Sequence, residues 1–378
     1  MDGLFRGVHL RISGSEAAKR LAAFPDSLGA RCVHRRILRV ARRAGGVRMK
    51  VLVTGAGGFI GSALVRRLLE EGHDVRCLVH RSHNLLDGLD VEIARGDVTS
   101  SDTLGVAMRG IEVVFHLAGS GRAGDWGSRQ WFFEVNTRGT KNVAEAAAEA
   151  GVRRVVHLSS LAVHTFRNYL DADETVPADQ RRYPYGESKA EAERALLEVS
   201  ARTGMEAVMV RPGLVVLGPN DHTAFVHMAP LLERGLWLQV GGGRRFMCYS
   251  YVENLAEGLL LCGSKPEAAG ETFVITDDLR LRWHQFISAL ARAFGRAKRE
   301  IDFPQPLARA IGVGAERLFE AAGSSVPPPA TDYRTALVCH DFHFGCAKAR
   351  RLLGYRPRVG YAEGLRRTVE WYRAWKKS

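Results

Sequence analysis

The sequence predicts an α/β fold in which a doubly wound parallel sheet is followed by a smaller C-terminal lobe. From Lys50 onward, short apolar stretches rich in β-branched residues alternate with stretches whose apolar residues recur at helical spacing. The first apolar stretch, 51–54, runs into a glycine-dense turn. Strands separated by helices of this length need right-handed crossovers, which make the strands parallel. We therefore expect a Rossmann-type sheet.

The expected strands and helices follow from two patterns of apolar residues. Fully apolar runs are typical of parallel strands buried on both faces, and apolar residues three and four apart indicate helices. Strands are expected at 51–54, 75–79, 91–93, 113–117, 155–159 and 207–211, and helices from Phe59 and over 131–149 and 184–203. Beyond Pro212 the alternation loosens, and we expect a strand at 271–276 and helices at 283–294, 346–353 and 361–375.

The glycine-dense turn has the spacing that a dinucleotide needs. Gly55, Gly58 and Gly61 lie three residues apart, around a helix start at Phe59 and Ile60. The first glycine permits the tight turn, the second lets a diphosphate approach the backbone, and the third lets the helix pack on the strand. The diphosphate would rest on the free N–H groups of the helix start. We interpret 49–212 as an NAD(P)-binding core and 213–378 as mainly a substrate-binding lobe, some segments of which return to the core.

Charge and composition weigh against several other classes of protein. The net charge is +13, but residues 1–48 hold eleven Lys and Arg against three acidic residues, so eight of these charges lie there. A nucleic-acid partner is therefore not expected. We expect 1–48 to be a poorly ordered basic extension with Met49 as the natural start, and an Arg-rich organelle transit peptide is the alternative. No apolar run reaches the roughly 20 residues of a transmembrane segment.

The six cysteines are scattered, without a CxxC pair or a metal-like spacing. They indicate reduced thiols in a cytoplasmic protein rather than a disulfide framework. The thirteen histidines are also scattered, and we interpret His157 and His164 as structural. No metal site is expected.

Tyr185 and Lys189 lie four residues apart at an expected helix start, which places the phenol and the ammonium on one face. A lysine one turn away can lower the pKa of the phenol, so that Tyr185 can donate or accept a proton near neutral pH. The preceding strand ends in Ser159-Ser160, whose hydroxyls are placed to polarise the same substrate oxygen. This order of glycine turn, serines and Tyr–Lys pair predicts a redox enzyme.

Several motifs together resemble one family. They are Thr54-Gly-Ala-Gly-Gly-Phe-Ile-Gly61, Gly96-Asp97, His116-Leu-Ala118, Val135-Asn-Thr-Arg-Gly-Thr-Lys-Asn142, Leu158-Ser-Ser160, Tyr185-x-x-x-Lys189 and Arg211-Pro212-Gly213. With them, residues 50–375 resemble an extended short-chain dehydrogenase/reductase of the NAD-dependent epimerase/dehydratase superfamily. The segments 251–256, 270–276 and 349–355, with Trp283, are most similar to the 3β-hydroxysteroid/sterol dehydrogenase branch. Gly124-Asp-Trp-Gly127 is similar to bacterial relatives that reduce 2-alkyl-3-oxoalkanoates.

The resemblance implies a role for each matching position. Tyr185 would be the acid/base, Lys189 would lower its pKa and hold the nicotinamide ribose, and Ser160 would bind the substrate oxygen in preference to Ser159. The cofactor would contact the catalytic pair and also Gly55, Gly58, Phe59, Ile60, Gly61, Asp97, Val98, Leu117, Ala118 and Pro212.

One position departs from the pattern of NAD-preferring members, which end the second strand in an acid that binds the ribose 2′-OH. Here no acid follows the strand until Asp87. Arg81 is placed to pair with a 2′-phosphate, and Ser82 to assist it. We therefore expect NADP to be favoured over NAD.

The sequence thus predicts an NAD(P)-dependent oxidoreductase that interconverts a secondary alcohol and a ketone on a small hydrophobic substrate, either sterol-like with a 3β-hydroxyl or derived from a 3-oxo fatty acid. A nucleotide-sugar epimerase or dehydratase is the alternative, with Arg234, Arg244 and Arg245 as candidate diphosphate ligands. A non-catalytic dinucleotide sensor is less favoured, because both Tyr185 and Lys189 are present. By analogy alone, a homodimer is expected. The 301–323 stretch is amphipathic at most, so peripheral membrane contact is compatible with the sequence but not favoured.

Overall fold

The computed structural model describes residues 48–120, 128–297, 299–324, 326–328 and 330–378. The expected basic extension, apart from Arg48, lies outside the described residues, as does the whole of the 124–127 motif. Among the described residues, none of the helices combines the length and the apolar character needed to cross a membrane.

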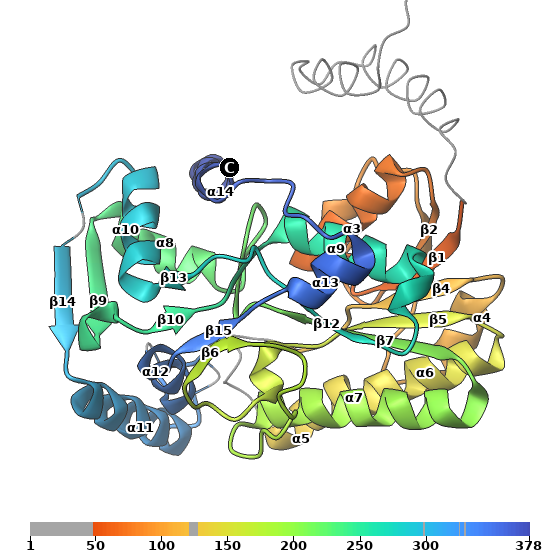
Figure 1. The fold of residues 1–378 in the computed structure, drawn as a ribbon, viewed down its shortest axis with the longest axis horizontal. Coiled ribbons are helices and arrows are strands. Elements are labelled where there is room, and N and C mark those ends of the chain that lie inside the picture. The colour runs from red at the N-terminus through yellow and green to blue at the C-terminus, as the bar shows by residue number, and fades with distance from the viewer. Residues whose placement is uncertain (1–47, 121–127, 298, 325, 329) are drawn as a thin grey trace, which may run out of the picture.

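A seven-stranded sheet forms the centre of the molecule, in the order β12-β7-β5-β4-β1-β2-β3, with every neighbouring pair parallel (Figure 1). Its strands are β1 Lys50–Thr54, β2 Asp74–Val79, β3 Glu92–Arg95, β4 Val113–His116, β5 Arg154–Leu158, β7 Glu206–Pro212 and β12 Thr272–Ile275. The order of the strands reverses between β1 and β4, and such sheets bind ligands at the carboxyl ends of the strands beside this reversal. The predicted Rossmann-type fold is confirmed.

Helices cover both faces of the sheet, which is why its central strands are mostly apolar (Figure 1). On one face lie α3 Phe59–Glu70, α9 Val252–Ser264 and α13 Ala347–Leu353, and on the other lie α4 Leu104–Met108, α6 Gly139–Glu149 and α7 Pro184–Thr203. Strand β12 and helices α9 and α13 follow residue 213 in the chain, so segments from the C-terminal half complete the layers of the core.

The helix expected over 131–149 is longer and less regular than its periodicity indicates. It begins as α5 Arg129–Phe132 and continues as six residues of π-helix, Phe133–Arg138, before α6. A π turn rotates the residues that follow it relative to a regular α-helix, and such turns are frequent at functional sites. Here the π turn contains Asn136, whose side chain is completely buried.

The second lobe consists of short elements around its own apolar core. Four two-stranded sheets pair β8 Val215–Leu217 with β11 Tyr249–Tyr251, β9 Leu236–Val240 with β14 Arg299–Phe303, β10 Phe246–Met247 with β13 Leu281–Arg282, and β6 Tyr169–Ala172 with β15 Phe342–Phe344. The helices are α8 Phe225–Glu233, α10 Trp283–Ala293, α11 Gln305–Ala321, α12 Asp332–Cys339 and α14 Tyr361–Trp375. The periodicity had indicated α10, α13, α14 and β12 in this half of the chain, but not the short paired strands.

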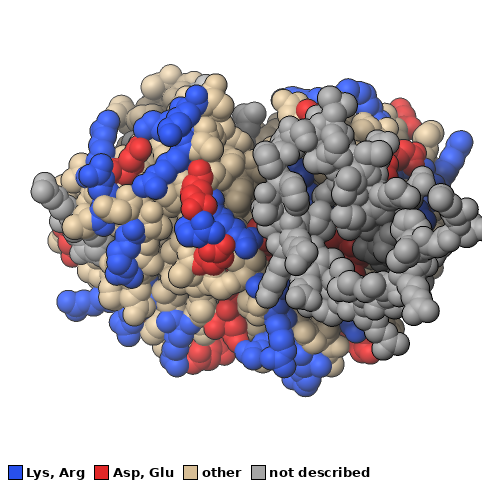
Figure 2. Space-filling model, turned by 90° about the horizontal axis from the view of Figure 1, so that it is seen from above, with Lys and Arg blue, Asp and Glu red and all other residues tan. Residues whose placement is uncertain are grey.

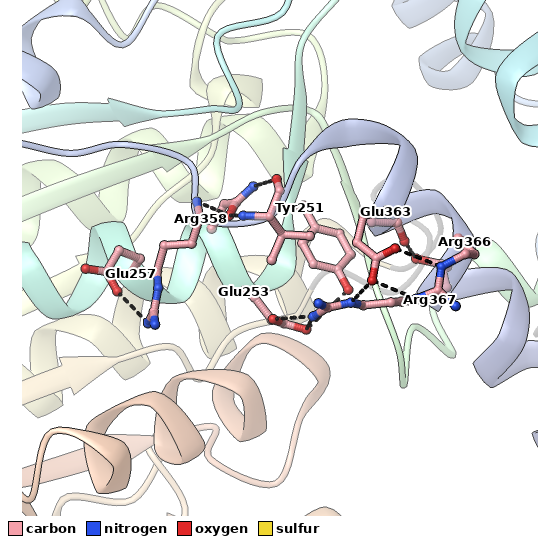
Figure 3. Close-up of polar contacts among 11 residues, drawn as sticks. Tyr251, Glu253, Glu257, Arg358, Glu363, Arg366 and Arg367 are labelled. Carbon is pink, nitrogen blue, oxygen red and sulfur yellow. Dashed lines mark hydrogen bonds and ion pairs between the residues drawn. The ribbon is translucent and has the colours of Figure 1, made fainter. Parts of the chain in front are cut away.

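The C-terminal helix is attached to the core by a network of ion pairs (Figure 3). Arg367 of α14 pairs with Glu253 at the start of α9 (3.1 Å). Arg358 pairs with Glu257 of α9 (3.3 Å), which also accepts a hydrogen bond from Arg67 of α3 (2.6 Å). The end of the chain is therefore connected through α9 to the helix that begins at the glycine turn.

Charges on the surface are mixed in sign. On the face seen in Figure 2, acidic side chains lie between the Lys and Arg side chains. On α14, Arg366 pairs with Glu363 (2.7 Å) and Glu370 (2.5 Å), three and four residues away. Neighbouring charges on this helix therefore offset one another.

Candidate active site

The glycine turn brings the ends of β1 and β4 into backbone contact. Gly55 has a φ of +68°, and a Cβ there would lie 2.7 Å from the Ala118 nitrogen and 2.8 Å from the Leu117 carbonyl carbon. A Cβ at Gly61 would overlap the Gly55 carbonyl oxygen. Glycine is therefore required at both positions, and Leu117 and Ala118, both predicted to contact the cofactor, lie directly against the turn.

The start of α3 presents backbone donors. Gly58 caps the helix in an extended conformation, and Phe59 and Ile60 are the first helical residues. Their N–H groups have no partner within the helix. A Cβ at Gly58 would meet one atom within 4 Å, the Gly55 carbonyl oxygen at 3.2 Å. The free N–H donors, together with the absence of a side chain at Gly58, fit a diphosphate.

Arg81 and Asp97 follow the ends of the neighbouring strands β2 and β3. Arg81 is exposed, and Asp97 is half-buried with its Oδ2 3.4 Å from His80 Nε2. Burial acts to raise the pKa of Asp97, but the hydrogen bonds of Thr99 and the charges of His80 and Arg81 bring it below its ordinary value. Val98 is buried beside it. Both residues that sequence reasoning assigned to the adenosine half thus lie at one edge of the sheet.

A chain of hydrogen bonds connects the glycine turn with the π turn. The Ala118 N–H donates to Thr54 Oγ1 (3.1 Å), which lies 2.7 Å from His116 Nδ1. His116 Nε2 lies 3.0 Å from Thr140 Oγ1, and this hydroxyl donates to the Asn136 carbonyl oxygen (2.6 Å). Thr140 must therefore accept from Nε2–H, which leaves Nδ1 to accept from Thr54. Burial lowers the pKa of His116 to about 3, so the ring is neutral.

Ser160, Tyr185 and Lys189 meet at the C-terminal end of β5. Tyr185 is the second residue of α7, and the Ser160 hydroxyl lies near enough to act on the pKa of its phenol by hydrogen bonding. Lys189, one turn later, donates from Nζ to the Leu158 carbonyl oxygen (2.8 Å). The Ser159 hydroxyl is buried without a partner among the described residues. The geometry favours Ser160 over Ser159 as the serine that shares a substrate oxygen with Tyr185.

Burial shifts the pKa of each catalytic candidate in the direction that favours its uncharged form. It raises the pKa of Tyr185, and the hydrogen bond with Ser160 acts in the opposite direction. It lowers the pKa of Lys189 to about 8, and the Glu193 carboxylate acts in the opposite direction. Tyr185 is therefore protonated at neutral pH and has a proton to donate. The lowering of the Tyr185 pKa by Lys189 stays a prediction.

Asn136 is a site residue to which sequence reasoning gave no role. Its Oδ1 accepts from the Ser120 N–H (2.8 Å), and its Nδ2 donates to the Ser120 carbonyl (3.3 Å) and to Ser188 Oγ (2.9 Å). A Cβ at Gly119 would lie 3.1 Å from Asn136 Oδ1 and 3.2 Å from Lys189 Nζ, so both side chains end beside the segment after β4. Its place in the 135–142 motif was the available signal, but the direction of the side chain depends on the π turn.

Pro212 is the last residue of β7 and lies where the sheet meets the second lobe. The next N–H, of Gly213, donates to Ser250 Oγ (2.9 Å), and a Cβ at Gly213 would lie 2.9 Å from the Cys248 carbonyl oxygen. The predicted neighbour of the nicotinamide is thus held at the same edge of the sheet as Ser160.

Aromatic side chains from several segments pack around Tyr185. The Phe132 ring meets the Tyr185 ring edge-on, with centroids 6.0 Å apart. Phe166 lies 5.3 Å from both Tyr183 and Tyr333, and these three rings cluster with Tyr185. We call Phe132, Phe166, Tyr183 and Tyr333 the aromatic wall. Tyr333 comes from α12, nearly 150 residues after Tyr185, so the local pattern around Tyr185 gave no sign of it.

His157 and His164 flank the Ser159-Ser160 strand end and are buried. Burial lowers the pKa of both, that of His164 to about 4. In the described part of the chain, no three His, Cys, Asp or Glu side chains are grouped to hold a metal ion.

The sequence and the fold are similar to those of known proteins. The model of a family described as NAD dependent epimerase/dehydratase matches residues 51–276. A 2-alkyl-3-oxoalkanoate reductase of Stenotrophomonas maltophilia is 32% identical over 84% of this chain and 98% of its own. A 3 beta-hydroxysteroid dehydrogenase/Delta 5→4-isomerase of Mycobacterium tuberculosis is 32% identical over 85% of this chain and 90% of its own. The structure of a dTDP-glucose 4,6-dehydratase from Streptomyces venezuelae, solved with NAD, has a TM-score of 0.67 at 25% identity and covers 86% of this chain and 97% of that one.

Proposed function

The chain belongs to the NAD dependent epimerase/dehydratase family and is an NAD(P)-dependent oxidoreductase, and on this premise we propose that it interconverts a secondary alcohol and a ketone on a hydrophobic substrate. The proposed substrate is a sterol-like 3β-hydroxy compound or a 3-oxo acid of fatty-acid type. The observation that carries this proposal is the aromatic wall beside the Ser160–Tyr185 pair. The names of the two relatives above describe substrates of these two classes.

The chain's own groups would act on one substrate oxygen. Ser160 and Tyr185 would hold this oxygen between two hydroxyls, and Tyr185 would donate its proton to the oxygen as the ketone becomes an alcohol. The reverse reaction would return the proton to Tyr185. The Lys189 ammonium would stabilise the phenolate formed in between. When bound, the nicotinamide cofactor supplies or accepts the hydride, and the protein supplies position and the proton.

A nucleotide-sugar substrate is the second candidate, and one feature favours it. A surface cavity of about 500 Å³ in the second lobe is lined by Arg244, Arg245 and Arg282. Arg245 already pairs with Asp341 (2.8 Å), and Arg282 donates to the Arg244 carbonyl oxygen (3.0 Å) but forms no ion pair with a described carboxylate, so the positive charges of Arg244 and Arg282 remain to attract a diphosphate. Arg234, also suggested by the sequence, lies at the end of α8 and does not line the cavity. The aromatic wall, which suits an apolar substrate better than a sugar, places this candidate second.

A substrate panel tests the two candidates against each other. Purified protein would be incubated with 3β-hydroxysteroids, 2-alkyl-3-oxo acids, and UDP- and dTDP-sugars, and nicotinamide absorbance and products would be followed. The proposal predicts a net change of nicotinamide absorbance with a steroid or an oxo acid. Conversion of nucleotide sugars alone, with no net change in the cofactor, would overturn it.

For the cofactor we propose a preference for NADP, on the basis of Arg81. This side chain is exposed at the end of β2 and forms no ion pair with a described carboxylate. Its charge helps to lower the pKa of Asp97, but this acid follows β3 rather than β2. A guanidinium without a partner would bind a 2′-phosphate, whereas an acid at the end of β2 would have repelled it.

The Arg81→Ala variant tests this preference. We expect kcat/KM to be higher for NADPH than for NADH in the wild type, and the variant to lose at least about tenfold with NADPH, since one charge-assisted contact is worth roughly 1.5–3 kcal/mol, with little change for NADH. Arg109→Ala, an exposed arginine after α4, is the matched control. Equal use of both cofactors by the wild type, or an Arg81→Ala variant like the control, would contradict the proposal.

A further inference from the structure

A buried ion pair lies behind the catalytic lysine. Arg211 of β7 donates to both carboxylate oxygens of Glu193 of α7, at 2.9 and 2.6 Å. The two residues are only 6% and 4% exposed. The removal of two charges from water costs free energy that their mutual attraction often fails to recover. A contribution to stability therefore does not explain this pair well. The residues next to it suggest a different role.

Lys189 lies one helical turn before Glu193 and is itself only 6% exposed. Its Nζ is fixed between the Leu158 carbonyl oxygen (2.8 Å) and the segment at Gly119. Burial alone favours the uncharged amine, and the pKa of Lys189 stands at about 8, with the Glu193 carboxylate holding it up. A further fall would leave much of the lysine neutral at physiological pH.

Among the described residues, Glu193 is the anion whose charge raises the pKa of Lys189. Tyr185 faces the lysine from α7 and is protonated, since burial raises its pKa. His116 of β4 and His157 of β5 face it from the sheet, and burial lowers the pKa of both, so they are neutral. The remaining charge is Arg211, which is bound to Glu193 by two hydrogen bonds.

We propose that Glu193, held by Arg211, is a positioning residue that keeps the Lys189 ammonium charged and directed at the site of the nicotinamide ribose and Tyr185. Arg211 fixes the carboxylate by two hydrogen bonds, one helical turn after the lysine, so that it is not free to rotate toward water. The same arginine precedes Pro212 and so joins the charge on the helix to the strand end expected beside the nicotinamide. This inference rests on the proposed function, because Lys189 has this task in a nicotinamide-dependent reaction.

The sheet contains a matched control at its other edge. Arg154 of β5 is fully buried and pairs with Glu206 at the start of β7 (2.6 Å). Its Nη1 donates to carbonyl oxygens at the end of α9, including that of Cys262 (2.9 Å). Both pairs join an arginine of the sheet to a carboxylate, but Glu206 is not among the groups that act on Lys189.

The experiment measures the dissociation constant of NADPH from pH 7 to 10 by cofactor fluorescence, in the wild type, Glu193→Gln and Glu206→Gln. NADPH affinity should weaken at alkaline pH as Lys189 loses its proton, and Lys189→Met should remove this dependence. We expect Glu193→Gln to move the alkaline loss of affinity to lower pH by roughly one unit, the usual effect of an adjacent opposite charge. Glu206→Gln should leave it unchanged. Equal profiles for Glu193→Gln and the wild type would overturn the proposal.

A double variant covers the case in which Glu193→Gln does not fold, because it leaves Arg211 buried and unpaired. Glu193→Leu combined with Arg211→Met removes both charges, a replacement that buried pairs usually tolerate. The proposal predicts a melting temperature near that of the wild type. It also predicts that the alkaline limb, the part of the pH profile in which NADPH affinity falls, is still moved to lower pH. A limb at the wild-type position would show that the pair is structural only and would refute the proposal.

The binding profile separates this inference from the proposed function. If the limb moves as expected but no steroid or oxo acid is turned over, the proposed substrate class is wrong and the role of Glu193 stands. If substrates are turned over and the limb does not move, the role of Glu193 is wrong and the proposed function stands.

Discussion

The two ends of the parallel strands differ. The C-terminal ends are followed by glycine and serine residues and by a helix start with free backbone N–H groups, whereas the side chains named below at the N-terminal ends already pair with one another. Gly55, Ser160 and Pro212 follow or end three of the strands on the first side. The Ser160 hydroxyl and the N–H groups at the start of α3 are donors at these strand ends. Binding and chemistry therefore belong to this edge of the sheet.

The opposite edge is closed by contacts within the protein. Arg154 pairs with Glu206 between β5 and β7, and Arg48 pairs with Asp74 at the start of β2. The backbone N–H of Lys50 donates to the Glu112 carboxylate (2.8 Å). In the described part of the chain, the charged side chains named at this edge pair with one another, whereas the C-terminal edge presents a serine hydroxyl and the N–H groups of a helix start. Substitutions at the two edges should therefore separate activity from stability.

The largest effect is expected from Tyr185→Phe, which removes the proton donor and keeps the ring. Turnover should fall by at least about 10²-fold, the usual contribution of a general acid, while NADPH affinity stays within a few-fold of the wild type. Tyr183→Phe, two residues earlier, removes a hydroxyl bound to Asp332 (3.1 Å) and is the control, with activity largely retained. A Tyr185→Phe enzyme with wild-type turnover would rule out the assigned role.

The next effect concerns the glycine turn. In Gly61→Ala the new methyl group would overlap the Gly55 carbonyl oxygen, so the start of α3 must move away from β1. Such overpacking typically costs about 1–3 kcal/mol, and we expect a lower melting temperature and roughly tenfold weaker NADPH binding. Gly105→Ala in α4, where a Cβ meets nothing within 4 Å, is the control for the substitution itself. Unchanged NADPH binding in Gly61→Ala would show that the turn does not carry the diphosphate.

The smallest effect on activity is expected at the closed edge. Glu206→Gln weakens the ion pair of buried Arg154, and we expect a loss of about 2 kcal/mol in the free energy of unfolding, as for other charge-assisted hydrogen bonds. The values of kcat and KM should not change. Urea denaturation together with steady-state kinetics checks this, and a marked fall in kcat at unchanged stability would contradict the division between the two edges.

Much of the core could be predicted because its signals are local. The spacing of Gly55, Gly58 and Gly61 defines one turn, and Tyr185 and Lys189 lie on one face of one helix. Alternating apolar periods indicated six of the seven strands of the sheet, and a further apolar run indicated the seventh, β12. Buried parallel strands must be apolar and crossover helices amphipathic, so their sequence patterns are strong.

The remainder depends on contacts between distant segments. Tyr333 reaches the site from α12, and the Arg211–Glu193 pair joins a strand to a helix across the interior. Asn136 was part of a noted motif, but a six-residue π turn sets the direction of its side chain, and helical periodicity cannot reveal such a turn. The two-residue strands β10 and β13 are too short to show a period.

Hydride transfer to the substrate carbon is the central claim, and isotope transfer tests it most directly. The protein would be incubated with NADPH deuterated at the transferring position and with the best ketone of the panel, and the product analysed by mass spectrometry. We predict an alcohol that carries one deuterium on its carbinol carbon and one equivalent of oxidised cofactor. A converted substrate without deuterium, and with the cofactor unchanged at the end, would contradict the account.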